Sequence, residues 1–314
     1  MPRTRGVQPE WRGLASLCFD LVMHPIWVET LDDPRLTDYR NVRDADLRRR
    51  RGLFMAEGRL VVEQLLGDSR FRADSVFMTP RSCEAMRPVL ARLPHGAPVY
   101  LAKQELFNQV VGFDMHRGCL AAGQIGRERQ PLELISAQPA DASLLVVLEG
   151  LTNTENVGGV FRNAQAFGAD GVLLCPRSCD PLYRKAIRVS MGGTLKVPFA
   201  RFDRWPDSLE QLRHAGYKLI ALDLAEDAMA LSDITSSIDL GSRVALVLGT
   251  EGRGLSEAAL GHVDHSVRIP MAPGIDSLNV ASASAIALQF LHSRGASAQP
   301  DRARASGARS REIP

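Results

Sequence analysis

The sequence is poor in lysine and has almost no net charge. Lysine occurs only four times, at Lys103, Lys185, Lys196 and Lys218, and 38 basic residues face 36 acidic ones for a formal net charge of +2. Nearly all positive charge is therefore arginine. Genomic base composition explains this bias more simply than selection for phosphate binding, although arginine binds phosphate in a bidentate manner. A nucleic-acid binder of this composition needs local basic patches, because it has no global excess of positive charge.

Cysteine is scarce, and its spacing does not fit a disulfide framework. The five cysteines are Cys18, Cys83, Cys119, Cys175 and Cys179. An odd number without regular spacing predicts reduced thiols and a cytoplasmic protein. Cys175 and Cys179 could form half of a metal site, but no second pair of Cys or His lies at a matching distance. We therefore expect no metal.

Long apolar runs are also missing. No run approaches the roughly 20 residues that a membrane-spanning helix needs, so we expect no membrane association. The apolar stretch from Leu14 to Trp27 is interrupted by Asp20, His24 and Pro25 and has no cleavage site after it, which argues against a signal peptide.

The chain of 314 residues is long enough for two domains with separate cores. Residues 1–30 are expected to be an N-terminal extension, either a docking helix or a poorly ordered segment. Residues 31–125 alternate between strand and helix patterns, which predicts a small α/β domain. Residues 126–142 are polar with two prolines and indicate a linker. Residues 143–294 predict a second α/β domain, and residues 295–314 a disordered tail.

Strand and helix patterns can be placed within both domains. In the first, we expect strands at 53–56, 75–78, 98–101 and 119–124, and helices at 57–66, 80–92 and 103–110. In the second, we expect strands at 144–149, 171–174, 196–199, 218–222, 243–248 and 265–269. The strand runs there are continuously apolar, as in Val146 to Leu148 and Ala245 to Leu248. This is typical of a parallel sheet that is covered on both faces.

One local basic patch stands near the start of the first domain. Leu36, Tyr39, Val42 and Leu47 are spaced for one face of a helix and leave the arginines largely outside. Contact with phosphate groups and a merely solvated helix face explain such a run about equally well. The candidate phosphate-binding residues, which would serve a nucleic acid, are Arg40, Arg43, Arg48, Arg49, Arg50 and Arg51.

The most informative stretch lies at the start of the second domain. An apolar run from Leu144 to Leu148 is followed by a polar turn and by apolar residues at helical spacing from Val157 to Phe167. Polar groups at the carboxyl end of a strand and next to a helix N-terminus form the typical site of an α/β fold. Arg162 is unusual in this helix, because its neighbours are small or apolar. Taken alone, it could simply pair with a carboxylate.

Two further stretches follow the same strand-and-turn pattern. One runs from Leu246 through Gly249, Glu251 and Gly252 to Ser256, and the other from Ile269 to Val280. Neither the G-x-G-x-x-G turn of a Rossmann cofactor site nor the Lys-Ser/Thr of a phosphate-binding P-loop is present.

Together, the three stretches resemble the motifs of the SpoU (TrmH) family of RNA ribose 2′-O-methyltransferases in the SPOUT superfamily, over roughly residues 34 to 293. The resemblance implies a C-terminal SPOUT domain with a parallel sheet and a deep trefoil knot that holds S-adenosyl-L-methionine. Residues 54–58 and 116–118 also resemble the small domain that precedes many such domains. That domain is similar to ribosomal protein L30 and handles RNA.

The resemblance also assigns roles to single residues. Around the acceptor ribose it places the catalytic group Arg162, Asn156, Glu251, Ser277 and Asn279. At the cofactor it places Gly249, Gly252, Ile269, Met271, Leu278 and Leu222. Ser277 is also expected to cap the helix that begins at Leu278. Arg162 cannot act as a free base, because a guanidinium stays protonated near neutral pH; it would bind the adjacent phosphate and polarise the hydroxyl.

Some alternatives stay open. A non-catalytic RNA-binding protein with the same fold is one, and a methyltransferase of tRNA instead of rRNA is another; rRNA is favoured because the first domain resembles that of rRNA-modifying relatives. Thr152 to Thr154 stand where an Asp-Pro pair is frequent in the family, which affects the subgroup. The resemblance also implies a homodimer, in which the small residues of the 278–292 helix would let two backbones approach closely.

Overall fold

The structure of the protein is a computed structural model, and it describes residues 25–40, 43–67, 69–115, 118–234, 242–275 and 277–298, with the side chains of 294–298 left out. The chain forms two compact units. One contains Met1–Gly67 and Phe71–Gln124, and the other contains Asp68–Arg70 and Ile125–Pro314.

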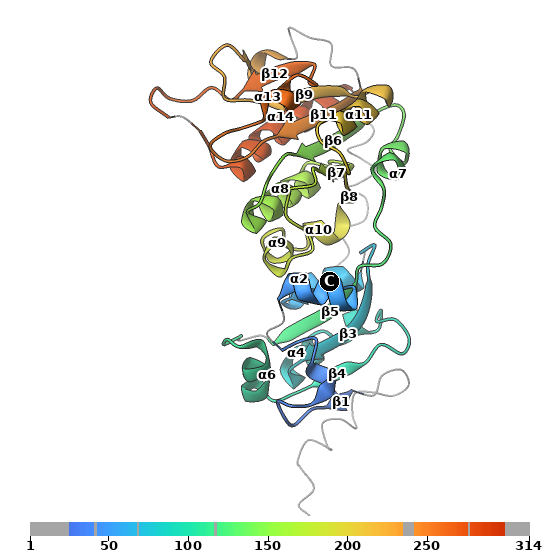
Figure 1. Cartoon of the computed structure of the whole chain (residues 1–314). Coiled ribbons are helices and arrows are strands. Elements are labelled where there is room, and N and C mark those ends of the chain that lie inside the picture. Colours follow the sequence, from blue (N-terminus) through green and yellow to red (C-terminus); the bar gives the residue numbers. More distant parts are fainter. Residues whose placement is uncertain are drawn as a thin grey trace, which may run out of the picture. The chain divides into compact units, whose positions relative to one another are not determined.

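The first unit is built on a five-stranded mixed sheet in the order β1-β4-β3-β5-β2 (Figure 1). The strands are β1 (Ile26–Trp27), β2 (Leu53–Glu57), β3 (Arg72–Met78), β4 (Val99–Leu101) and β5 (Cys119–Gln124). The helices include α2 (Asp44–Arg51), α3 (Arg59–Leu66), α4 (Pro80–Ala85), α5 (Arg87–Leu90) and α6 (Gln104–Val111). This α/β arrangement was predicted, and a likeness to ribosomal protein L30 stays a prediction.

The core of the first unit extends into the predicted N-terminal extension. β1 pairs with β4, and Val28 beside it is 2% exposed. Residues 25–30 therefore belong to the first unit, while residues 1–24 lie outside the described part of the chain. Tyr39 is buried in the same core, and its hydroxyl lies 2.8 Å from Ser75 Oγ.

Two expected helices of the first unit are interrupted. The predicted helix at 80–92 is split at Met86, because Pro88 lacks the amide hydrogen that a continuous helix needs. The helical face proposed for Leu36 to Leu47 is divided between a 3-10 turn, Pro34–Leu36, and α2. Its residues Leu36 and Leu47 are nevertheless buried, and Val42 lies outside the described residues.

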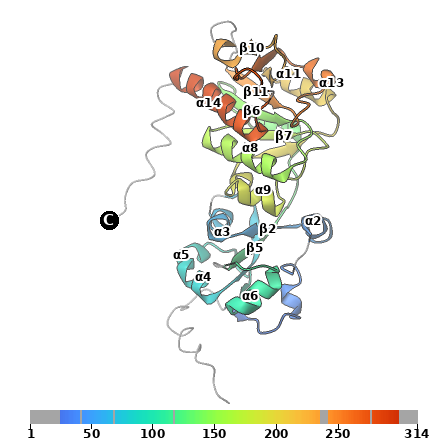
Figure 2. The same cartoon turned by 90° about the vertical axis from the view of Figure 1, so that its left-hand side faces the viewer.

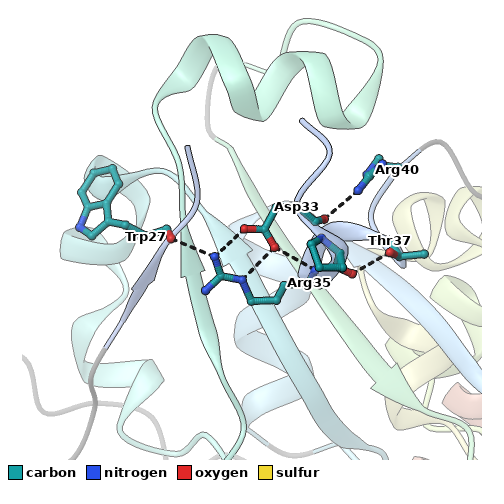
Figure 3. A network of polar contacts seen from close by, with 6 residues as sticks. Trp27, Asp33, Arg35, Thr37 and Arg40 are labelled. Atoms are coloured by element: carbon teal, nitrogen blue, oxygen red, sulfur yellow. Dashed lines mark hydrogen bonds and ion pairs between the residues drawn. The ribbon is translucent and has the colours of Figure 1, made fainter. Parts of the chain in front are cut away.

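Asp33 fixes the 3-10 turn through a local network (Figure 3). Asp33 Oδ1 accepts hydrogen bonds from the backbone N of Arg35 at 2.9 Å and from Arg35 Nε at 2.8 Å. These contacts with Arg35 lower the pKa of the Asp33 carboxyl to about 2. Arg40 Nη2 donates to the carbonyl oxygen of Asp33 at 2.7 Å, so this candidate RNA-binding arginine is part of the same network.

The second unit is built on a seven-stranded sheet in the order β10-β12-β9-β11-β6-β7-β8. All of its neighbouring strands pair in parallel, as predicted. The strands are β6 (Ser143–Leu148), β7 (Gly171–Leu174), β8 (Phe199–Arg201), β9 (Lys218–Leu222), β10 (Met229–Ala230), β11 (Arg243–Leu248) and β12 (His265–Arg268). The strand expected at 196–199 begins only at Phe199, because Gly193–Lys196 forms helix α10.

Alternate strand residues feed two cores, one on each face of this sheet. Val146 and Leu148 pack with helices α8 (Thr154–Ala166) and α14 (Val280–Ala298). Leu145 and Val147 pack on the other face with α7 (Pro131–Ser136) and α11 (Glu210–His214). Figure 2 shows α8 and α14 side by side over the first face.

The linker prediction for residues 126–142 is wrong in part. α7 lies within it, and Leu134 and Ile135 of α7 are 0% and 1% exposed. Because the residues around them are polar, the sequence did not indicate this short amphipathic helix, which belongs to the core of the second unit. At the other end, α14 continues to Ala298, beyond the expected start of the tail at 295, and residues 299–314 lie outside the described part.

The sequence predicted neither a membrane-spanning helix nor a metal site. Within the described residues, no helix is long and apolar enough to cross a bilayer, and no group of three or more His, Cys, Asp or Glu residues could hold a metal ion. Cys83, Cys119 and Cys175 are buried and form no disulfide within the described residues, and burial raises the pKa of the Cys119 thiol to about 12.

Candidate active site

Helix α8 starts the site directly after β6. Asn153 caps it, because its Oδ1 accepts a hydrogen bond from Glu155 N at 2.9 Å. Val157, Val160 and Phe161 face the core, and Arg162 is exposed. The Arg162 guanidinium has no hydrogen-bond or ion-pair partner in the described ranges. The sequence left open that Arg162 simply pairs with a carboxylate of the fold. The described ranges contain no such pair.

Helix α14 approaches one side of α8 closely. A Cβ on Gly159 would lie 2.5 Å from Ala281 Cβ. Asn163 Nδ2 donates to the carbonyl oxygen of Ala281 at 2.6 Å and to Ser284 Oγ at 2.9 Å. Ala281 and Ser284, two of the small residues of α14, thus serve a helix contact within one chain, and the homodimer stays a prediction.

Asn279 belongs to the third sequence motif and joins it to the first and to the second. Its Nδ2 donates to Asn156 Oδ1 at 2.9 Å and to Glu251 Oε1 at 2.7 Å. Its Oδ1 accepts from Ala281 N at 2.9 Å and Ser282 N at 3.3 Å, so Asn279 caps α14. The prediction that Ser277 caps this helix is wrong, because the helix begins at Val280, two residues later than expected.

The turn after β11 carries Glu251. Thr250 and Gly254 exchange backbone hydrogen bonds of 2.9 and 3.1 Å, which closes a tight loop. A Cβ on Gly249 would lie 2.2 Å from the carbonyl carbon of Gly254, so only glycine fits there without a backbone shift. The loop therefore depends on Gly249, and it presents Glu251 to Asn279.

A buried carboxylate that the sequence analysis missed supports this loop. Glu149 is 2% exposed at the end of β6. It accepts hydrogen bonds from Trp205 Nε1 at 2.7 Å, Ser256 Oγ at 2.7 Å and Ser256 N at 2.9 Å. Ser256 also caps the short helix α13 (Glu257–Leu260). An acidic residue directly after a fully apolar strand was the available signal.

A cavity of about 670 Å³ opens beside this cluster. The six residues predicted to bind the cofactor, namely Gly249, Gly252, Ile269, Met271, Leu278 and Leu222, all line it. Ser277 and Glu251 line it as well, so two of the predicted catalytic residues border the same space. Asp223 and Glu226, which the sequence analysis did not single out, add two carboxyl groups to its wall.

The arginine run of the first unit is largely engaged in ion pairs. Arg49 and Arg50 lie 3.2 and 3.8 Å from Asp46 Oδ1, and Arg51 lies 3.0 Å from Asp38 Oδ2. Arg40 has an ion pair of 3.8 Å with Asp32 in addition to its bond to Asp33. Arg48 is half-buried, and Arg43 is exposed. The acidic partners reduce the local charge that the sequence alone indicated.

Comparison with known proteins identifies the family of the chain. Residues 143–289 match the model of the SpoU rRNA Methylase family. An uncharacterized tRNA/rRNA methyltransferase of Mycobacterium bovis is 42% identical over 260 residues, which is 82% of this chain and 88% of the relative. The chain belongs to the SpoU rRNA methylase family. As a member of this family it is an RNA methyltransferase.

Solved structures show the same fold. The AdoMet-bound rRNA methyltransferase from Sinorhizobium meliloti is 26% identical with a TM-score of 0.72, covering 85% of this chain and 97% of that one. A putative RNA methyltransferase of the TrmH family from Porphyromonas gingivalis is 25% identical with a TM-score of 0.69, covering 85% of this chain and all (100%) of that one. The predicted SpoU membership and α/β fold are thus confirmed, and the trefoil knot stays a prediction.

Proposed function

We propose that this RNA methyltransferase transfers a methyl group from S-adenosyl-L-methionine to a ribose 2′-hydroxyl of structured RNA. The observation that carries the proposal is the bridge from Asn279 to Asn156 and Glu251 at the rim of the cavity, with the exposed Arg162 on the same helix as Asn156. Three polar groups that hold one another, together with a guanidinium that has no partner among the described residues, are suited to orient a hydroxyl and an anion.

The cavity fits S-adenosyl-L-methionine in size and chemistry. Its volume of about 670 Å³ lies in the usual range for pockets that bind small molecules. Leu222, Ile269, Met271 and Leu278 offer apolar surface for the adenine ring. Asp223 and Glu226 offer negative charge to a ligand with a sulfonium and an ammonium group. When bound, the cofactor supplies an electrophilic methyl group.

The residues of the chain then act on the acceptor. Arg162 binds the phosphate next to the target ribose and polarises the 2′-hydroxyl. Asn156, Glu251 and Asn279 hold the ribose by hydrogen bonds, and Ser277 lies at the cavity edge to support it. As the hydroxyl oxygen forms its bond to the methyl carbon, the bond from that carbon to sulfur breaks. The hydroxyl proton leaves late, through the phosphate that Arg162 holds.

Methyl transfer from tritiated S-adenosyl-L-methionine to rRNA tests this proposal. The modified product should contain a ribose whose 3′ phosphodiester resists alkaline hydrolysis, because the reaction at that bond needs a free 2′-hydroxyl. Label on a base with normal alkaline cleavage would reject ribose as the acceptor. Binding of RNA without binding of the cofactor in calorimetry would favour the alternative of a non-catalytic RNA-binding protein.

We further propose rRNA as the substrate in preference to tRNA, because a separate α/β unit precedes the catalytic unit. Mapping of 2′-O-methyl sites on total RNA from a knockout strain distinguishes the two. A missing site in rRNA supports the proposal, and a missing site in tRNA alone rejects it. A homodimer and a knotted catalytic unit are part of the same proposal.

A further inference from the structure

A basic segment of the second unit lies next to Arg162 and has no role in the proposed chemistry. Residues 176–196 contain five basic residues, Arg177, Arg184, Lys185, Arg188 and Lys196, and a single acidic one, Asp180. Asp180 is 8% exposed, whereas Arg177, Lys185 and Arg188 are exposed. The segment therefore carries an excess of positive charge in a chain with a net charge of only +2.

Helix α9 (Arg184–Val189) runs beside α8, as Figures 1 and 2 both show. Lys185 Nζ lies 3.0 Å from Glu155 Oε1. One turn along α8, a Cβ on Gly158 would lie 2.7 Å from the carbonyl oxygen of Ala186. Further along, a Cβ on Gly193 would lie 3.0 Å from Gln165 Oε1. The segment from 185 to 193 thus follows α8 past the level of Arg162.

The position of Arg162 on α8 follows from these neighbours. α9 and α10 pack on the side with Gly158 and Gln165, and α14 packs on the side with Gly159 and Asn163. At 3.6 residues per turn, position 162 falls between these two sides. Arg162 is therefore exposed on the face of α8 that lies between α14 and the basic segment.

Met191 adds an unusual feature to this segment. Its φ of 52° lies in the left-handed region, and it is the sole non-glycine residue with a positive φ in the described ranges. Its side chain is 38% exposed although it is large and apolar. A strained backbone that holds an apolar side chain in solvent next to a basic helix is typical of a site that contacts a ligand.

We propose that Lys185, Arg188 and Met191, named here the α9 surface, bind the RNA strand next to the acceptor nucleotide. The two cations bind phosphates, and the Met191 side chain packs on a ribose or base face. This inference rests on the proposed function and assigns part of the RNA affinity to the catalytic unit. RNA fits the surface because phosphates supply the regularly spaced negative charge that a row of exposed cations attracts.

Substitution of Glu155 should change the RNA affinity in the opposite direction from substitution of the two cations, which makes the proposal testable. In the free protein it neutralises Lys185, and RNA would have to compete for that cation. Glu155→Gln should therefore tighten RNA binding, whereas Lys185→Gln and Arg188→Gln should weaken it. A change of one in the number of bound phosphates should alter the slope of log K against log salt by about 0.7, or affinity by about fivefold at 0.1 M salt.

The experiment uses the full chain and a fluorescein-labelled single-stranded RNA of about 12 nucleotides, in the range of sites for single strands. Anisotropy titrations at several salt concentrations give affinity and slope. Lys218→Gln is the matched control, because Lys218 is exposed at the opposite end of β9 from the cavity residue Leu222. Calorimetry with S-adenosyl-L-methionine is run on every variant.

Weaker binding by Lys185→Gln and Arg188→Gln, tighter binding by Glu155→Gln and no change for Lys218→Gln would support the α9 surface. Equal behaviour of all four variants, with cofactor and RNA still bound by the unmodified protein, would overturn it and leave the proposed function intact. An unmodified protein that binds neither would reject the proposed function itself. Met191→Gly is the safeguard against misfolding, because it relieves the strained backbone and should still weaken RNA binding.

Discussion

Asn279 donates its side-chain amide to Asn156 across two helix starts, at 2.9 Å, while its oxygen caps the helix that follows it. The two polar atoms of this side chain therefore have different roles, one structural and one in forming the site. The Oδ1 atom fixes the N-terminus of α14, and the Nδ2 atom holds Asn156 and Glu251 together. This division allows the two roles to be separated by mutation.

Asn279→Asp should keep the helix cap and destroy the bridge. A carboxylate still accepts from Ala281 N and Ser282 N, but it cannot donate to Glu251 and adds a like charge beside it. We expect thermal stability near that of the unmodified protein and a fall in turnover of at least about tenfold. Asn279→Ala should lose both, with about 1 kcal/mol less stability from the missing cap. Full activity of Asn279→Asp would contradict the bridge as a functional element.

Arg162→Ala should lower turnover by roughly a hundredfold and leave the fold unchanged. Stability should change by less than about 0.5 kcal/mol, because the exposed guanidinium has no partner in the described ranges. Arg162→Lys is the control that keeps the charge and loses the planar fork, and it should recover only part of the activity. Single-turnover methyl transfer and thermal unfolding measure the two effects. Unchanged turnover in Arg162→Ala would reject the site.

Glu149→Gln should weaken cofactor binding without touching the cavity. The carbonyl oxygen of glutamine can still accept from Trp205 Nε1 and Ser256 Oγ, but its amide nitrogen cannot accept the hydrogen bond that Ser256 N donates to Oε2, so the end of the Gly249 loop loses a fixed partner. A buried unsatisfied group costs about 1 to 3 kcal/mol of stability. We expect a raised Kd for S-adenosyl-L-methionine in calorimetry. Ser256→Ala, which removes only one of the donors, should show a smaller effect; the reverse order would argue against Glu149 as the organiser.

Gln in place of Arg48 to Arg51 should flatten the salt dependence of RNA binding by about 0.7 to 0.9 for each phosphate that the run no longer binds. The ion pairs of Arg49, Arg50 and Arg51 with Asp46 and Asp38 reduce the number of phosphates that we expect the run to bind. Arg43 is exposed and lies outside the run, so Arg43→Gln separates its contribution to RNA binding from that of the run. An unchanged slope and affinity would mean that the run is a solvated helix face.

The proposed homodimer should have a mass of about 69 kDa in light scattering, twice the 34.3 kDa of the chain. Ala281 and Ser284, two of the small residues of α14, pack on α8 of the same chain. The exposed Ile286 on α14, at 43%, is the position where a charge can test a helix interface, and Ile286→Glu should give a monomer. A monomeric unmodified protein at micromolar concentration would overturn the proposal.

The sequence by itself determined the two α/β units and the parallel sheet, and its resemblance to the family supplied the candidate site residues. Continuous apolar runs such as Ala245 to Leu248 are typical of strands buried on both faces, and glycine at 249 is needed for local backbone reasons. Such features depend on a few neighbouring residues, so they can be read along the chain.

Only the tertiary structure decided how distant residues complete one another. Asn279 caps α14 because this helix begins at Val280, two residues later than the cap preference of Ser277 suggested. Glu149 became visible as a support because Trp205 and Ser256, far apart in sequence, both donate to it. The arginine run lost much of its free charge to Asp46 and Asp38, and Lys185 met Glu155 across two helices. These interactions depend on packing between elements, where sequence spacing carries no information.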